Sequence, residues 1–280
     1  MKTIFLSFLT LCFFCTASVY GQKNEVSFHA GGGLSTLGYS LSQGDRTQGF
    51  GGEAGVGYIR FLSRSFGVGS GVSLSLYNAS AAGIGNTIAN FADEYGDSYE
   101  LRTSFTGYNE RQQALFLRIP LTLQYRGGGR HPLYVQAGVG LNIPVSARYE
   151  ASAATLHNEA YYPTYDVAIT LPSFMGLGDF TNRRTEDKLT LQTVYTASVE
   201  TGIRWRLAPS WALYTALYAD YGLNDAVKDR NRDHFRPNAT TPDDFALNSV
   251  LVSRQAPSSP FAGSTSLIAI GLKFRIAFTL

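Results

Sequence analysis

The chain has 280 residues, of which 44% are hydrophobic, 13% aromatic and only 16% charged. Lys and Arg number 23 and Asp and Glu 21, so the net charge is +2, and the sequence contains no run of five or more basic residues. This balance excludes a protein that gathers DNA or RNA. The 29 Gly, 17 Tyr and 18 Phe favour a single large β structure. The longest apolar stretch lies at the extreme N-terminus, so membrane residence elsewhere would require strands.

Residues 1–21 read as an export signal. Lys2 gives a positive start, residues 4–15 form an apolar core, and cleavage is expected near Gly21. The remaining residues, 22–280, are predicted to form one domain. Cys12 and Cys15 are the only cysteines and lie within the signal, so we expect no disulfide in the mature protein.

Apolar residues recur with a period of two in the body of the chain. Between residues 115 and 125 the odd positions are Leu, Leu, Ile, Leu, Leu and Tyr, whereas the even positions are mixed and include Arg118. The same alternation runs through residues 133–145 and through the C-terminal residues 268–280. Strict alternation over so many residues predicts long strands with one apolar face.

Eight segments of the chain share this pattern. They are residues 25–38, 49–61, 66–78, 110–126, 132–148, 189–207, 211–223 and 265–280. Three connections are tight and the other four are longer. An even number of strands with turns at one rim and loops at the other predicts an all-β fold, an eight-stranded antiparallel up-and-down transmembrane β-barrel with long extracellular loops. Alternating stretches at 161–171 and 245–253 leave ten strands as an alternative.

Charged side chains indicate which face of the strands is inside. Six of them lie opposite the Leu, Ile and Val row of their own strand: Glu53, Arg118, Glu200, Arg204, Lys273 and Arg275. A polar interior with an apolar exterior suits a membrane, whereas a soluble lipocalin-like barrel would show the reverse. We predict that these six form a paired network that fills the lumen, because isolated buried charges are costly. A gated proton or ion path is the alternative reading.

Aromatic residues cluster near the three tight turns. Trp205 and Trp211 flank the turn at 208–210, and the other two turns are flanked by Phe61, Phe66, Tyr125 and Tyr134. Because aromatic side chains concentrate at membrane interfaces, we interpret these six residues as a periplasmic girdle.

Three stretches carry a family resemblance: LFLRIPLTLQYR at 115–126, GGGRHPLYVQAGVGLNIPV at 127–145 and WALYTALYADYGLND at 211–225. Together with the final apolar strand, they make the chain resemble the outer-membrane β-barrel domain family common in Bacteroidetes, which includes the PorT-like proteins. This resemblance implies a signal-bearing eight-stranded barrel, with a link to protein secretion for some members. It supplies no catalytic motif.

No catalytic, metal or cofactor site is expected. The four histidines are scattered without metal-site spacing, and no nucleophile motif occurs. We expect a non-enzymatic outer-membrane protein, a structural or surface-binding barrel that contacts membrane lipid and, through its long loops, other envelope or secretion proteins. The alternatives are a PorT-like accessory of secretion or envelope assembly, a small-solute channel, and a rim enzyme built from Asp220, Asp225, Asp233 and His234.

Overall fold

The computed structural model describes residues 24–280 except 130, 237, 239–240 and 242–243, so the predicted signal at 1–21 lies outside the described residues. In the described part, the secondary structure is almost entirely strand, with one short 3-10 turn, η1, at Ser173–Met175. No helix in that part of the chain is long and apolar enough to cross a membrane.

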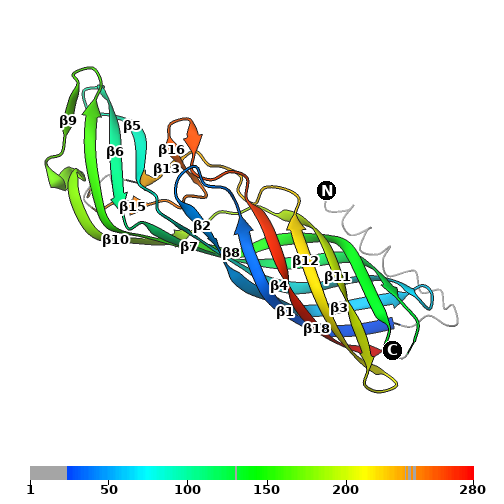
Figure 1. The fold of residues 1–280 in the computed structure, drawn as a ribbon. Coiled ribbons are helices and arrows are strands. Elements are labelled where there is room, and N and C mark those ends of the chain that lie inside the picture. The colour runs from blue at the N-terminus through cyan, green and yellow to red at the C-terminus, as the bar shows by residue number, and fades with distance from the viewer. Residues whose placement is uncertain (1–23, 130, 237, 239–240, 242–243) are drawn as a thin grey trace.

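A ring of antiparallel strands forms the barrel (Figure 1). In chain order its strands are β1 (Asn24–Gly38), β3 (Phe50–Phe61), β4 (Phe66–Ala82), β7 (Asn109–Arg126), β8 (Leu133–Tyr162), β11 (Val194–Arg206), β12 (Trp211–Gly222) and β18 (Ser266–Thr279). Each strand pairs with the next, and β18 pairs with β1 over fourteen positions, from Glu25 opposite Thr279 to Gly38 opposite Ser266. This last pairing closes the ring, so the barrel has no open edge. The predicted eight-stranded up-and-down barrel is confirmed.

The two ends of the barrel differ as the sequence predicted. Residues 62–65, 127–132 and 207–210 make tight connections at the short-turn end, where Asn24 and Leu280 also meet through a backbone hydrogen bond of 2.8 Å. The four longer connections lie at the opposite, long-loop end. Their added strands do not enter the ring, so the ten-stranded alternative is wrong.

Strand β8 runs far past the barrel and supports a second structure, which we call the distal sheet. This sheet comprises the outer part of β8 with β5 (Asn86–Ala92), β6 (Ser98–Thr106), β9 (Val167–Ile169) and β10 (Gly178–Lys188). From Thr155 to Tyr161, β8 pairs with β6, whereas nearer the barrel it pairs with β7. Figure 1 shows the distal sheet at the end of the molecule opposite the C-terminus. The sequence predicted β8 to end near residue 148.

The described residues of the 223–265 connection lie between the barrel mouth and the distal sheet. They contain the short strands β13 (Arg232–Asp233), β14 (Phe235–Arg236), β15 (Ala246–Leu247), β16 (Ser253–Ala256) and β17 (Ser259–Pro260). The remaining strand, β2 (Asp45–Gln48), pairs with the end of β4. This 223–265 loop contributes buried Val250, Leu251 and Phe261 to one apolar cluster with inward-facing barrel residues such as Tyr77 and Phe116. The long-loop end of the barrel is therefore capped by apolar side chains.

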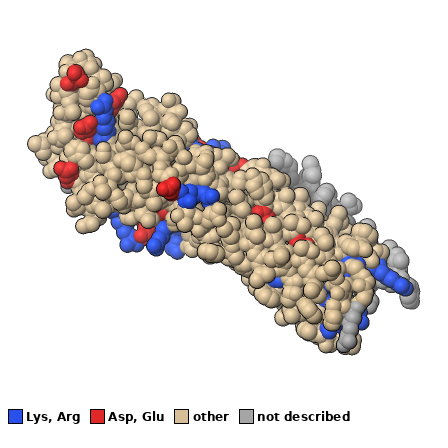
Figure 2. All heavy atoms as spheres, in the orientation of Figure 1, with Lys and Arg blue, Asp and Glu red and all other residues tan. Residues whose placement is uncertain are grey.

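The outward face of the barrel is apolar and exposed. On β18, for example, Ile270, Leu272, Phe274 and Ile276 are each about half exposed, with fractions from 47% to 56%. Figure 2 shows few charged side chains on the visible face of the barrel, whereas charges gather on the distal sheet and near the short-turn end. An exposed apolar belt around a closed ring is stable only in lipid, which identifies the ring as the membrane-spanning part.

Candidate functional site

Alternation along the strands directs the predicted charged residues into the lumen. On β3, Val56 and Tyr58 are exposed while Glu53 is only 7% exposed, and on β7, Ile119 and Leu121 are exposed while Arg118 is buried. The same alternation turns Glu200 on β11 and Arg275 and Lys273 on β18 inward: Glu200 and Arg275 are buried, and the Lys273 side chain is 11% exposed. All six predicted lumen charges therefore face inward.

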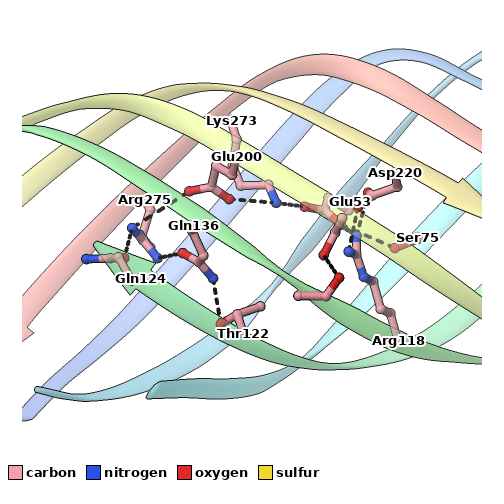
Figure 3. A network of polar contacts seen from close by, with 12 residues as sticks. Glu53, Ser75, Arg118, Thr122, Gln124, Gln136, Glu200, Asp220, Lys273 and Arg275 are labelled. Carbon is pink, nitrogen blue, oxygen red and sulfur yellow. Dashed lines mark hydrogen bonds and ion pairs between the residues drawn. The ribbon is translucent and has the colours of Figure 1, made fainter. Parts of the chain in front are cut away.

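Five of the six form one chain of ion pairs across the lumen (Figure 3). Arg118 Nη1 lies 3.1 Å from Glu53 Oε2, and Lys273 Nζ lies 2.5 Å from Glu53 Oε1. Lys273 Nζ also lies 3.1 Å from Glu200 Oε2, and Glu200 Oε1 in turn lies 3.7 Å from Arg275 Nη2. Acids and bases alternate along this chain, so each charge has an opposite charge on at least one side.

Asp220 on β12 completes the chain beyond Arg118 and was assigned by the sequence to the rim. Its two oxygens accept hydrogen bonds from Arg118 Nη1 and Nη2, each of 2.6 Å. Asp220 shares the parity of Tyr214 and Tyr218, which are buried, and this even spacing is the signal that could have placed it inside. With Asp220, three carboxylates balance three cations.

Arg204 lies apart from this chain, in a second cluster nearer the short-turn end. Its Nη2 is 3.3 Å from Glu25 Oε1, and Arg126 Nη1 is 3.0 Å from the same oxygen. Tyr214 donates a hydrogen bond of 2.6 Å to Glu25 Oε2. The sequence analysis missed Glu25 and Arg126 because neither lies near the middle of its strand. The prediction of one network containing Arg204 is thus corrected to two clusters.

Polar side chains fill the space beside Arg275. Its guanidinium donates hydrogen bonds of 2.9 Å to Gln136 and to Gln124, and it lies over the ring of Tyr214 at 4.2 Å from the centroid. Tyr134 donates a hydrogen bond of 2.6 Å to Glu200. The cavity along these residues has a volume of about 60 Å³. That is room for a few water molecules and for no continuous pore.

The cap at the long-loop end contains its own buried polar centre, which lies beyond the apolar belt. Glu110, at the start of β7, is fully buried and accepts hydrogen bonds from Tyr108, Gln112, Ser249 and the Val250 amide. Burial raises the pKa of Glu110, while these four donors oppose the rise. Ser249 and Val250 belong to the 223–265 loop, so this carboxylate attaches the cap to the barrel rim.

His234 in the same loop is also fully buried. Its ring contacts the rings of Phe105, Tyr108 and Phe261, and its Nδ1 lies 3.0 Å from Ser253 Oγ. Burial lowers the pKa of His234 to about 3, so the imidazole is neutral at physiological pH. A neutral ring packed among aromatic residues supports the cap.

The four residues considered for a rim enzyme do not converge. Asp220 lies in the lumen, Asp225 pairs with Arg230 at 2.8 Å, and Asp233 pairs with Arg254 at 2.8 Å, whereas His234 is enclosed in the cap. Within the described part of the chain, no group of three or more His, Cys, Asp or Glu side chains is arranged to hold a metal ion.

The predicted aromatic girdle is corrected at two positions. Phe66, Tyr125, Trp205 and Trp211 are exposed by 37% to 58% and face outward near the tight turns. Phe61 and Tyr134 are 2% and 1% exposed and face the lumen, where Arg126 lies over the Phe61 ring at 4.2 Å. Both lie an even number of residues from inward-facing Glu53 or Gln136, so strand parity outweighs their closeness to a turn.

A pocket of about 500 Å³ opens at the far end of the distal sheet. Three of its rings come from adjacent strands: Phe91 on β5, Tyr99 on β6 and Tyr162 on β8. Their centroids are 5.9 Å apart for the first pair and 5.4 Å for the second. Leu171 and Met175, which precede β10, also line the pocket and are 70% and 57% exposed. We call this the tip pocket; sequence reasoning missed it because its walls come from three separate loops.

The rim of the tip pocket is acidic. Asp93 Oδ1 accepts hydrogen bonds from the Tyr95 and Asp97 amides, at 3.0 and 2.9 Å, and Asp93 Oδ2 accepts one of 3.3 Å from Tyr162. Glu94 makes no hydrogen bond or ion pair with any described residue. No Lys, Arg or His occurs among the described residues that line the pocket.

Several solved structures match most of this chain at low sequence identity and low TM-score. OprG from Pseudomonas aeruginosa is 10% identical over 93% of this chain and 96% of its own, with a TM-score of 0.37. A major outer membrane protein from Thermus thermophilus is 14% identical over 92% and 99%, also at 0.37. Neisserial surface protein A is 10% identical over 91% and 95%, at 0.32. Comparisons with protein-family models and with curated protein sequences gave no match.

Proposed function

We propose that this protein is exported through the signal at 1–21 to the outer membrane, where the barrel anchors a non-enzymatic binding element, the distal sheet. In this proposal the long-loop end faces the cell exterior and the short-turn end faces the periplasm. Membrane lipid surrounds the apolar belt, and the tip pocket meets the ligand or partner.

The observation that carries this proposal is the contrast between a filled lumen and an open tip. The lumen is occupied at mid-height by the ion-pair chain and at the long-loop end by the apolar cap. An eight-stranded barrel is only wide enough for side chains, which disfavours the small-solute channel and a gated ion path. The tip, by contrast, offers a pocket of the size that holds small ligands.

Lipid does not explain the exposed apolar residues of the tip. Tyr95 is 85% exposed, and Tyr165, Leu171, Phe174 and Met175 are 57% to 70% exposed. These residues lie in the connections of the distal sheet, which stands at the end of the molecule opposite the C-terminus (Figure 1). An apolar cluster rimmed by charges and held away from the membrane is typical of a recognition surface.

Photocrosslinking in intact cells tests the proposal. A benzophenone side chain at Tyr95 should form a discrete adduct that is not lipid, identified by mass spectrometry of the tip peptide. The matched position is Val199, an outward-facing residue of β11 that is 48% exposed and should crosslink only to lipid. Lipid adducts alone at both positions, or no adduct at Tyr95, would contradict a binding role for the tip.

A PorT-like accessory of secretion or envelope assembly is the second candidate. It is favoured by the edge of the distal sheet, where β5 pairs only with β6 among the described strands, although Thr87 near the start of β5 donates hydrogen bonds to the Arg254 and Gln255 carbonyls of β16. An unpaired strand edge can accept an extended segment of another protein by strand addition. A protease-sensitive, polypeptide-sized adduct at Tyr95 would support this role over small-ligand binding.

A further inference from the structure

We propose that the tip pocket binds a small organic cation, an ammonium group carried on an apolar or aromatic body, with the cation among the tyrosine rings and facing Asp93 and Glu94. This inference rests on the proposed function, because it names the class of ligand that the distal sheet would take. It commits to a small molecule because the pocket volume, about 500 Å³, lies in the range of small-ligand sites.

The aromatic row supplies the first half of the recognition. Phe91, Tyr99 and Tyr162 form a row across three strands, in which Tyr99 and Tyr162 are stacked with an interplanar angle of 30°. Tyr165 continues the row at 6.4 Å from Tyr162 but does not itself line the pocket. The face of an aromatic ring carries negative electrostatic potential, so the rings that border the pocket attract a cation, while the apolar lining accommodates its hydrocarbon part. This arrangement suits an ammonium group better than a hydroxyl-rich ligand.

The carboxylates supply the second half. Three acidic residues, Asp93, Glu94 and Asp97, fall within one turn between β5 and β6. Asp93 is held in place by two backbone amides and by Tyr162, and Asp97 accepts a hydrogen bond of 3.0 Å from Tyr165. None of these three carboxylates forms an ion pair with a basic side chain among the described residues. The nearest ion pair on this sheet, Arg102 with Glu100, involves β6 residues of opposite parity to Tyr99 and Leu101.

The alternation of side chains along the strand explains why the opposite face of the distal sheet is not an equivalent site. Residues alternate along β8, so Ala160 and Tyr162 line the pocket, whereas Tyr161 points to the other face and carries Arg102 over its ring at 3.7 Å. That ring already has a cation, and Tyr161 also donates a hydrogen bond of 2.8 Å to Asp166. Tyr161 therefore provides a matched control for the pocket tyrosines.

Titration calorimetry on the purified, detergent-solubilised full chain tests the inference. The probes are benzyltrimethylammonium, neutral benzyl alcohol and anionic phenylacetate. We expect the cation to bind about tenfold more tightly than the alcohol, and phenylacetate to show no binding. Binding of phenylacetate as tight as that of the cation, or absence of cation binding, would overturn the proposal.

Variants separate the charge from the rings. Glu94→Gln should reduce the affinity for the cation about fivefold and leave the affinity for the alcohol unchanged, whereas Tyr99→Leu should reduce both affinities. Tyr95→Ala removes a ring that is 85% exposed, so it should leave the fold intact and weaken binding of the cation. Tyr161→Leu should change neither affinity. Equal losses in Tyr161→Leu and Tyr99→Leu would overturn the assignment to this pocket.

The two proposals fail in different ways. If the cation does not bind but the Tyr95 photocrosslink persists in cells, the ligand class is wrong and the binding role of the tip stands. If the cation binds to the purified chain with the expected variant pattern but no crosslink forms in cells, the site is a cation pocket and the proposed cellular role is contradicted.

Discussion

Arg118 and Asp220 face each other in the lumen through two hydrogen bonds of 2.6 Å each. The pair joins β7 to β12, which are separated in the ring by β8 and β11. A planar guanidinium that meets a carboxylate with both nitrogens fixes the relative position of the strands as well as neutralising both charges. The lumen is therefore braced across its width by side chains rather than kept open.

Replacing Glu200 tests the ion-pair chain. Glu200→Leu removes the carboxylate that pairs with Arg275 in this chain and leaves Lys273 with Glu53 alone. Removing one partner of a buried pair costs about 3–5 kcal/mol, so the folded band on unboiled gels should lose heat resistance.

The matched control for Glu200 is its neighbour Val199, which faces outward on the same strand. Val199→Leu should leave the heat resistance unchanged, since it only adds a methylene toward lipid. Greater heat resistance in Glu200→Leu would mean that Glu200 faces lipid, because removal of a lipid-facing charge stabilises a barrel.

Replacing Glu110 tests how the cap is attached. Glu110→Gln replaces one carboxylate oxygen by an amide NH2 group, which cannot accept the hydrogen bonds that the oxygens now receive from Gln112, Ser249 and the Val250 amide. An unsatisfied buried group costs about 1–3 kcal/mol, so we expect faster proteolysis within 223–265 while the barrel stays folded. The exposed Glu186→Gln is the control, and equal proteolysis rates in the two variants would rule out this role for Glu110.

The cap should loosen in mild acid because of His234. The unfolded loop takes up a proton near pH 6.5, whereas the folded loop does so only near pH 3, so the unfolded state binds more protons in between. Stability is then lost as the pH falls from about 6.5 toward 3. Hydrogen exchange of residues 223–265 should increase over that window.

His234→Phe isolates this effect, since it keeps an aromatic ring among Phe105, Tyr108 and Phe261 and removes the titrating group. The variant should lose the increase in hydrogen exchange that acid causes in the unmodified protein. Buried Glu110 acts with the opposite sign, because its raised pKa makes the folded state hold a proton more tightly. An unchanged pH profile in His234→Phe would assign the dependence elsewhere.

The two tryptophans test the membrane position of the short-turn end. Trp205 and Trp211 are the only Trp residues in the chain, and both are partly exposed beside the turn at 207–210. In reconstituted vesicles, quenchers attached near the lipid headgroup should reduce their fluorescence more than quenchers near the bilayer centre. The reverse order would remove these residues from the interface.

Alternation was sufficient to predict the barrel and the direction of its charges. The outward rows at 115–125, 133–145 and 268–280 define the lipid face, and every charge opposite those rows lies inside. The same rule, applied without exception, would have placed Phe61, Tyr134 and Asp220 inside as well. The prediction went wrong where closeness to a turn or a rim was given more weight than parity.

The distal sheet and the cap could not be predicted in the same way. Their strands are short, and their cores combine residues far apart in sequence, such as Glu110 with Val250 or Tyr149 with Leu247. Outside the membrane both faces of a strand can be covered or wet, so alternation no longer indicates one inside. The tip pocket depends on these long-range contacts.

Single-channel recording in planar bilayers tests most directly the central claim that the lumen is closed by side chains. The purified full chain should give no steady ohmic current, and Glu200→Leu should also stay silent because the apolar cap remains in place. Removal of the 223–265 loop should at most produce brief, small openings, since the ion-pair chain still fills the barrel. A stable conductance in the unmodified protein would contradict the account.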